Sequence, residues 1–192
     1  EEALVVLLWE VFDRLEGFSV TLREVYALVH PRVFYDVYRP LLSGFDKKGL
    51  LLEGVEGGKE VYPKGPSAGQ SALFVLLDLF LGVRHIDSAK AFQEEMAAVY
   101  MPAPHRLLLQ DVGARVHSVG SVADFVAAHP HCPEVEGAWR ACLESLARFR
   151  AAHLQVAKRF LPGTSTGTGA SSFETMLHQA LEASAPPPPR IP

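Results

Sequence analysis

Apolar side chains recur at spacings of three and four along most of the sequence, a pattern typical of amphipathic helices. Gly17 is expected to end the first helix, and Thr21, with Glu24 three residues later, to cap the second. Pro40 should kink or end the third helix, because proline has no N–H to donate. The sequence therefore predicts an all-α fold, with helices at 4–15, 21–30, 31–43, 67–83, 88–100, 104–119, 122–129, 134–161 and 172–183.

Two stretches depart from this pattern. Residues 44–66 are rich in glycine and hold only short apolar runs, which predicts a surface excursion with a small hairpin near 46–66. Residues 186–192 form a Pro-rich tail that is expected to be disordered. We therefore expect one helical unit over 1–185, followed by the tail.

Composition narrows the class of protein. A chain of 192 residues with 48% hydrophobic content can bury one sizeable core. The net charge of -4, without a basic stripe, argues against nucleic-acid binding, and no apolar run approaches the roughly 20 residues that cross a bilayer. The two cysteines do not suggest a disulfide framework, so a reducing, cytoplasmic setting is expected.

The long predicted helix carries the strongest chemical signal. His153 lies in the middle of its apolar stripe, and Arg150 precedes it by one turn. His153 is either a satisfied core histidine or an axial ligand of haem iron, with Arg150 able to pair with a haem propionate. Spacing alone does not decide between the two. The members of the stripe are Cys142, Leu146, Phe149, His153, Val156 and Phe160.

Two other polar positions invite a functional interpretation. Asp78 interrupts an apolar helix, and its apolar flanks favour burial with a partner over a solvated break. The run His129-Pro130-His131-Cys132 holds possible zinc ligands, but it lies in a turn and lacks a second cluster. The sequence therefore does not favour a zinc site there.

Five segments, in order, resemble the indoleamine 2,3-dioxygenase family. Residues 34–44 (FYDVYRPLLSG) are similar to its distal helix, and 65–71 (GPSAGQS) to a segment beside the haem. Residues 101–106 (MPAPHR) resemble a turn of the family, and 148–156 (RFRAAHLQV) its proximal helix. Residues 167–169 (GTG) resemble a mobile loop over the pocket.

The resemblance implies a haem b cofactor and a role for each matching residue. His153 would hold the iron, and Arg150, Asp78, Ser67 and Ala68 would support or approach the haem. Taken alone, Ser67 would be a helix cap, Arg39 a surface arginine and 167–169 a linker. With the resemblance, Arg39 binds the substrate carboxylate and 167–169 form a lid. The substrate-binding residues would be Phe34, Tyr35, Arg39, Leu42, Ser67, Ala68, Gly167, Thr168 and Gly169.

The implied activity is insertion of O2 across the indole C2–C3 bond of L-tryptophan to give N-formylkynurenine, the first step of the kynurenine pathway. The cofactor carries this chemistry, so no acid–base residue is predicted, but a reductant for ferric haem is needed. The alternatives are a myoglobin-like O2-binding haem protein of the same family and a haem-free helical interaction module. Phe34, Arg39 and 167–169 favour the enzyme, because an oxygen carrier needs no carboxylate clamp.

The family's chains are longer than this sequence. They carry a small N-terminal domain and further helices ahead of the part that is matched here. We therefore expect that part of the distal pocket wall is absent from these 192 residues.

Overall fold

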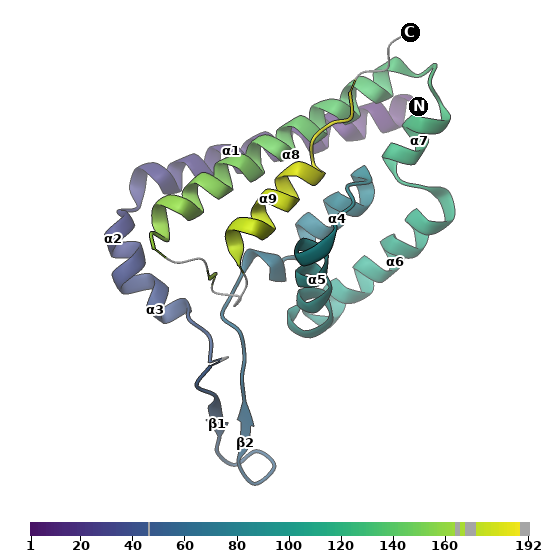
Figure 1. The fold of residues 1–192 in the computed structure, drawn as a ribbon. Helices are drawn as coiled ribbons and strands as arrows, with labels where there is room; N and C mark the ends of the chain where they lie inside the picture. The colour runs from purple at the N-terminus through teal and green to yellow at the C-terminus, as the bar shows by residue number, and fades with distance from the viewer. Residues whose placement is uncertain (46, 164–165, 168–171, 189–192) are drawn as a thin grey trace.

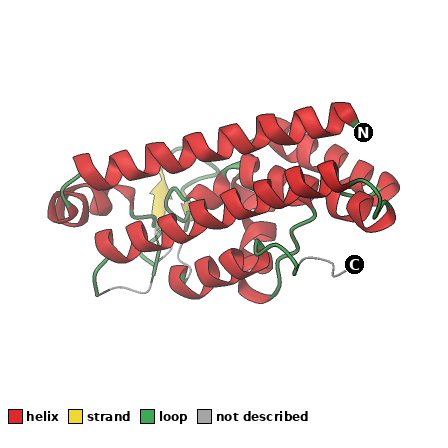
Figure 2. Cartoon of the chain, turned by 90° about the horizontal axis from the view of Figure 1, so that it is seen from above, coloured by secondary structure: helices red, strands yellow, loops and turns green. Residues whose placement is uncertain are grey.

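The computed structural model describes residues 1–45, 47–163, 166–167 and 172–188, and this part of the chain is mostly helical, as predicted (Figure 1). The two longest helices are α1 (Glu2–Leu28) and α8 (Pro133–Phe160), which lie side by side (Figures 1 and 2). They run in the same direction, because Leu8 contacts Cys142 near their starts and Tyr26 contacts Phe160 near their ends.

The remaining elements form a second layer below this helix pair and a hairpin that projects from it (Figure 1). Helix α9 packs on α8 and α5, and α4 packs on α6, α7 and α8. The elements are α2 (Pro31–Val33), the π-helical turn η1 (Phe34–Tyr38), α3 (Arg39–Leu42), β1 (Leu50–Leu52), β2 (Lys59–Val61), the 3-10 turn η2 (Ala68–Gln70), α4 (Ala72–Leu81), α5 (Asp87–Glu95), the π-helical turn η3 (Met96–Tyr100), α6 (Ala103–Val119), α7 (Val122–Ala128) and α9 (Phe173–Ala183).

The main core lies where α1, α4, α7 and α8 meet. Leu8 and Leu15 of α1 pack there with Val135 and Leu146 of α8. Trp139 also lies there, and its indole N–H donates to the Leu81 carbonyl at 2.9 Å. The bond satisfies the one polar atom of a large apolar side chain, so α8 is fixed against the end of α4 without a buried unpaired donor.

Helix α1 is continuous, so the predicted break after Gly17 is wrong. Gly17 is exposed and costs only about 1 kcal/mol relative to alanine within a helix. Leu15 and Ser19 on either side of it are buried, and this packing holds the helix together. The Thr21 hydroxyl donates to the Gly17 carbonyl at 3.2 Å, a bond within a helix rather than a helix cap.

Pro40 changes the local helix type, as the sequence predicts in part. The chain from Pro31 to Leu42 stays helical but passes through the π-helical turn η1. The Arg39 N–H bonds to the Phe34 carbonyl five residues earlier, one residue beyond the α-helical spacing. Pro40 then stands in the first turn of α3, where its missing N–H costs least.

The predicted helix at 67–83 is divided in two. Ser67 caps only the short turn η2, and Ser71 then adopts an extended conformation and caps α4. Helix α4 ends at Gly82, whose φ of 82° favours glycine. The hairpin expected within 46–66 is confirmed, with Leu50 opposite Val61 and Leu52 opposite Lys59.

The Pro-rich tail is described as far as residue 188, and 189–192 lie outside the described residues. Arg140 donates to the carbonyls of Pro187 and Pro188, so this part of the tail is bonded to α8. None of the helices in the described part of the chain is both long and apolar enough to cross a membrane.

Candidate functional site

The solvent exposure of the α8 stripe that contains His153 varies along the helix. Leu146 is fully buried before His153, and Phe160 is 2% exposed after it, while the stripe residues Phe149, His153 and Val156 between them are half-buried. Phe149 stacks on Phe74 with ring centroids 5.0 Å apart, and the His153 ring lies 6.1 Å from Phe149. His153 therefore stands at an aromatic edge of the core, where an additional flat, apolar group can cover it.

The environment of His153 favours the neutral imidazole. Its burial lowers the pKa below the usual 6.5, and the positive charge of Arg150 lowers the pKa further. Within the described part of the chain, no hydrogen bond involves either ring nitrogen. A neutral imidazole with an uncommitted lone pair is the form that ligates iron.

Asp78 is buried with a partner, as its apolar flanks predict, and that partner is Arg150 of α8. Arg150 donates through Nη2 to both carboxylate oxygens of Asp78, at 2.7 and 2.8 Å, and the side chains are 4% and 7% exposed. Its Nη1 donates to the Ala180 carbonyl and the Ser184 hydroxyl of the α9 end. Both Nη groups are thus occupied within the protein, and the pairing of Arg150 with a haem propionate stays a prediction. Losing one partner of such a pair costs about 3–5 kcal/mol.

Sequence reasoning missed two further partners of Asp78. The His85 Nε2 lies 2.7 Å from Asp78 Oδ2, and the Gln93 side chain donates to the same oxygen at 3.1 Å. A cavity of about 400 Å³ borders these three residues. The only signal in the sequence was that a carboxylate in an apolar helix needs several donors. Which donors reach it depends on where the chain runs after α4.

A second group of predicted residues gathers around Arg39. Its Nη2 donates to the Thr166 carbonyl at 2.6 Å, and its guanidinium lies 5.9 Å from the centroid of the Tyr35 ring. The Phe34 ring meets Phe160 of α8 edge-on, with centroids 5.5 Å apart. The buried Arg39 Nη1 has no hydrogen-bond partner among the described residues. This arrangement leaves a charged donor beside the predicted lid, available to an anionic ligand.

Within the segment 67–71, the local contacts explain why Ser67, Gly69 and Gln70 are small or polar. The Ser67 hydroxyl accepts the Gly69 N–H at 3.3 Å, and the Gln70 amide donates to the Gly65 carbonyl at 3.1 Å. A Cβ at Gly69 would lie 2.2 Å from the Phe92 ring, so only glycine fits. The capping role of Ser67 is therefore confirmed, and its approach to haem stays a prediction.

Other predicted features stay untested by the geometry. Gly167 is half-buried, and 168–169 lie outside the described residues. Two cavities in the described part of the chain, of about 330 and 400 Å³, do not border His153. Leu42, Ser67 and Ala68 are also predicted site residues. Among the described residues, none of them shares a hydrogen bond or ring contact with His153.

The fold and these residues define a mostly helical protein whose long helix α8 carries a half-buried histidine with a lowered pKa. The family model for indoleamine 2,3-dioxygenase matches residues 1–186, and the chain belongs to this family of haem dioxygenases. A 6-hydroxytryptophan 2,3-dioxygenase of Fusarium equiseti is 32% identical over 183 residues, covering 92% of this chain and 44% of that protein.

Two other relatives carry different names, one a dioxygenase and one a myoglobin. An indoleamine 2,3-dioxygenase of Saccharomyces cerevisiae is 30% identical over 185 residues, covering 84% of this chain and 40% of that protein. A myoglobin of Haliotis diversicolor is 33% identical over 137 residues, covering 68% of this chain and 35% of that protein. The chain thus spans less than half the length of each of these relatives.

Proposed function

We propose that this chain forms the haem-binding part of a dioxygenase that inserts both atoms of O2 across the C2–C3 bond of L-tryptophan. The product is N-formylkynurenine, and the reaction opens the kynurenine pathway. When bound, haem b would supply the redox chemistry with O2, and the activity would also need a reductant in the cytoplasm. The protein binds and orients both groups and excludes water from them.

The residues around His153 fit a haem. A neutral imidazole that has no hydrogen bond among the described residues can ligate iron, and the half-buried side chains of Phe149 and Val156 on α8 offer an apolar face for the haem ring. The ion pair of Arg150 with Asp78 fixes the turn of α8 that precedes His153. Such outer contacts orient an iron ligand and are part of the site.

Arg39 provides the observation that carries the assignment to an enzyme. Its buried Nη1 lacks a partner among the described residues, and its Nη2 holds the carbonyl of Thr166, next to the predicted lid. A substrate carboxylate would accept a hydrogen bond from Nη1. Arg39 would then bind the substrate through Nη1 and Thr166, next to the predicted lid, through Nη2. A protein that only stores O2 has no use for this donor.

Replacing His153 tests the haem site directly. His153→Ala should abolish stable haem binding, whereas the exposed His117 of α6 can be replaced by alanine without effect. The measurement is the visible absorption spectrum of each variant after equal haem loading and gel filtration. Full haem occupancy with an unchanged ferrous spectrum in His153→Ala would rule out the assignment.

The similarity to a molluscan myoglobin supports one other candidate, a haem protein that binds O2 without oxidising indoles. Turnover separates the two. A dioxygenase that is supplied with a reductant, O2 and tryptophan accumulates N-formylkynurenine, whereas an oxygen carrier shows reversible O2 binding and no product.

A further inference from the structure

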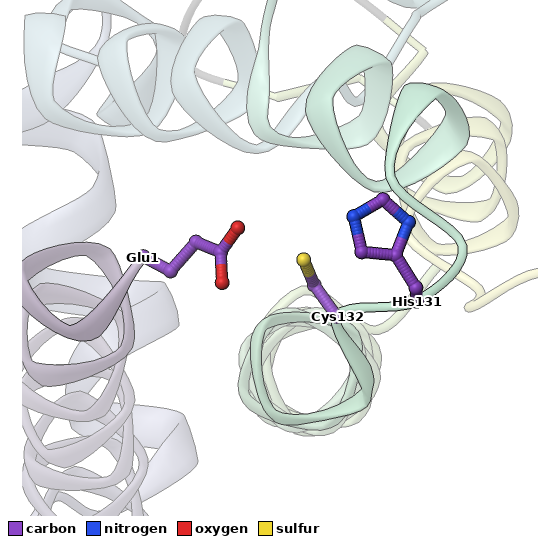
Figure 3. Close-up of side chains that lie close together, drawn as sticks. All are labelled: Glu1, His131 and Cys132. Atoms are coloured by element: carbon purple, nitrogen blue, oxygen red, sulfur yellow. The ribbon is translucent and has the colours of Figure 1, made fainter.

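The structure brings three metal-binding side chains together at the end of the molecule opposite His153. Glu1 at the start of α1, His131 in the turn after α7, and Cys132 at the start of α8 place their ligand atoms within 4.8 Å of one another. Figure 3 shows the Glu1 carboxylate and the His131 ring on either side of the Cys132 sulfur. The sequence did not favour zinc here because it lacked a further ligand, and the parallel packing of α1 and α8 supplies one.

We propose that Glu1, His131 and Cys132 form a binding site for Zn²⁺. A thiolate, an imidazole and a carboxylate are the three ligand types that zinc takes in proteins, whereas magnesium and calcium prefer oxygen alone. Three protein ligands leave one position of a tetrahedral zinc for water or an external group. The site is independent of the haem site and of the proposed dioxygenase activity.

The backbone holds the three residues in place before any metal binds. The Glu1 carbonyl accepts the N–H groups of Leu4 and Val5, and the Cys132 N–H donates to the His129 carbonyl at 3.1 Å. His129 is itself fixed, because its ring stacks on a neighbouring aromatic ring and its Nδ1 bonds to a backbone carbonyl. Zinc bonds of about 2.0–2.3 Å need ligand atoms roughly 3.5 Å apart, so small side-chain rotations complete the site.

The accessibility of the three residues fits a site that closes on a metal. Glu1 and His131 are exposed, while Cys132 is 8% exposed. Burial raises the pKa of the Cys132 thiol, and the Glu1 carboxylate beside it raises the pKa further. Zinc takes cysteine as the thiolate, so binding releases the thiol proton.

Cobalt titration of the metal-free protein is the sharpest test. One equivalent of Co²⁺ should give a near-ultraviolet thiolate-to-cobalt band and the visible bands of a tetrahedral ion, and Zn²⁺ should displace it. Cys132→Ser should abolish the near-ultraviolet band, and Glu1→Gln and His131→Asn should each weaken binding by at least about tenfold. Zn²⁺ should also raise the Tm of the wild type but not of Cys132→Ser, because the ion links the starts of α1 and α8.

Two control variants locate the signal. Cys142→Ser removes the other thiol, and His153→Ala removes the proposed iron ligand, and both should keep the cobalt spectrum. Absence of the thiolate band at millimolar Co²⁺ would overturn the proposal. So would a band that survives Cys132→Ser, or unchanged affinity in both Glu1→Gln and His131→Asn.

Discussion

Arg39 shows how one side chain gains a role that its neighbours in the sequence do not reveal. It follows the π-helical turn η1, which is wider than an α-helical turn, and directly precedes Pro40. One Nη group holds the Thr166 carbonyl, and the other is buried without a partner among the described residues. A buried charged donor without an acceptor is costly, so a bound carboxylate would stabilise the site.

The Arg39→Ala variant should weaken tryptophan binding and leave haem binding unchanged. A charged hydrogen bond to a carboxylate contributes about 1.5–3 kcal/mol, which is roughly a tenfold to hundredfold loss of affinity. Tryptophan titration of the haem-loaded protein, followed by its visible spectrum, measures the loss. The exposed Arg32 of α2 gives a matched control, Arg32→Ala. Equal tryptophan affinity in the two variants would remove Arg39 from the site.

Two glycines of the chain should respond to alanine in opposite directions. Gly69 lies against the Phe92 ring, where a Cβ would overlap it, so Gly69→Ala should destabilise the protein by about 1–3 kcal/mol. Gly17 faces open space within α1, so Gly17→Ala should stabilise it by about 0.5–1 kcal/mol. Urea unfolding compares both with the wild type. If Gly69→Ala unfolds like the wild type, the close contact with Phe92 is not real.

The pairing of α1 with α8 is the main contact between elements. It is apolar along its length, and Glu16 adds a polar bridge at its middle. Ser145 and Arg148 of α8 both donate to the Glu16 carboxylate, at 2.5 and 2.7 Å. These bonds lower the pKa of Glu16 below its usual 4.5, with the Ser145 hydroxyl contributing most. The bridge is therefore strongest when Glu16 is ionised.

Replacing Glu16 should change how stability depends on pH. A carboxyl whose pKa is lowered by folding stabilises the protein above its unfolded pKa, and this contribution is lost as the pH falls through the folded pKa. The wild type should thus be more stable than Glu16→Gln at pH 7, and the difference should vanish well below pH 4.5. Urea unfolding from pH 7 to pH 3 measures it. Glu10→Gln, on the exposed face of the same helix, should show no such convergence.

At the scale of the whole molecule, one side of α1 is buried and the other is exposed to solvent. Leu8 and Leu15 are buried against α8, whereas Val6, Val20 and Leu28 share an opposite, exposed face. Leu28 is 83% exposed. Large apolar side chains that are left in water favour association. The relatives are more than twice as long as this chain, so other parts of such proteins have the opportunity to cover these surfaces.

The 192-residue chain should self-associate through this face of α1. Val6→Lys together with Leu28→Lys should lower the apparent mass at micromolar concentration and leave the Tm nearly unchanged, because both side chains are exposed. Sedimentation velocity measures the mass. Glu10→Lys places a lysine on the same face by reversing a charge, without removing an apolar side chain, and should associate more than the double variant. A wild-type chain that stays monomeric at high concentration would contradict this prediction.

The sequence by itself determined most of the helices and the grouping of chemical residues. Spacing placed α6 to α9 within one or two residues, because amphipathic periodicity and caps are local properties. It also predicted that Asp78 is buried with a partner, because an apolar helix cannot leave a carboxylate unpaired, and the structure shows that this partner is Arg150. Motif order pointed to His153 and Arg39, and those roles stay predictions.

Only the tertiary structure decided the rest, and the reasons are physical. Gly17 stays helical because packing of α1 on α8 outweighs a local cost of about 1 kcal/mol. Asp78 gains His85 and Gln93 because the chain returns beside α4. Glu1 reaches Cys132 because α1 and α8 run in the same direction. These features depend on contacts between different elements, or on packing that overrides a local preference. The local sequence pattern predicts neither.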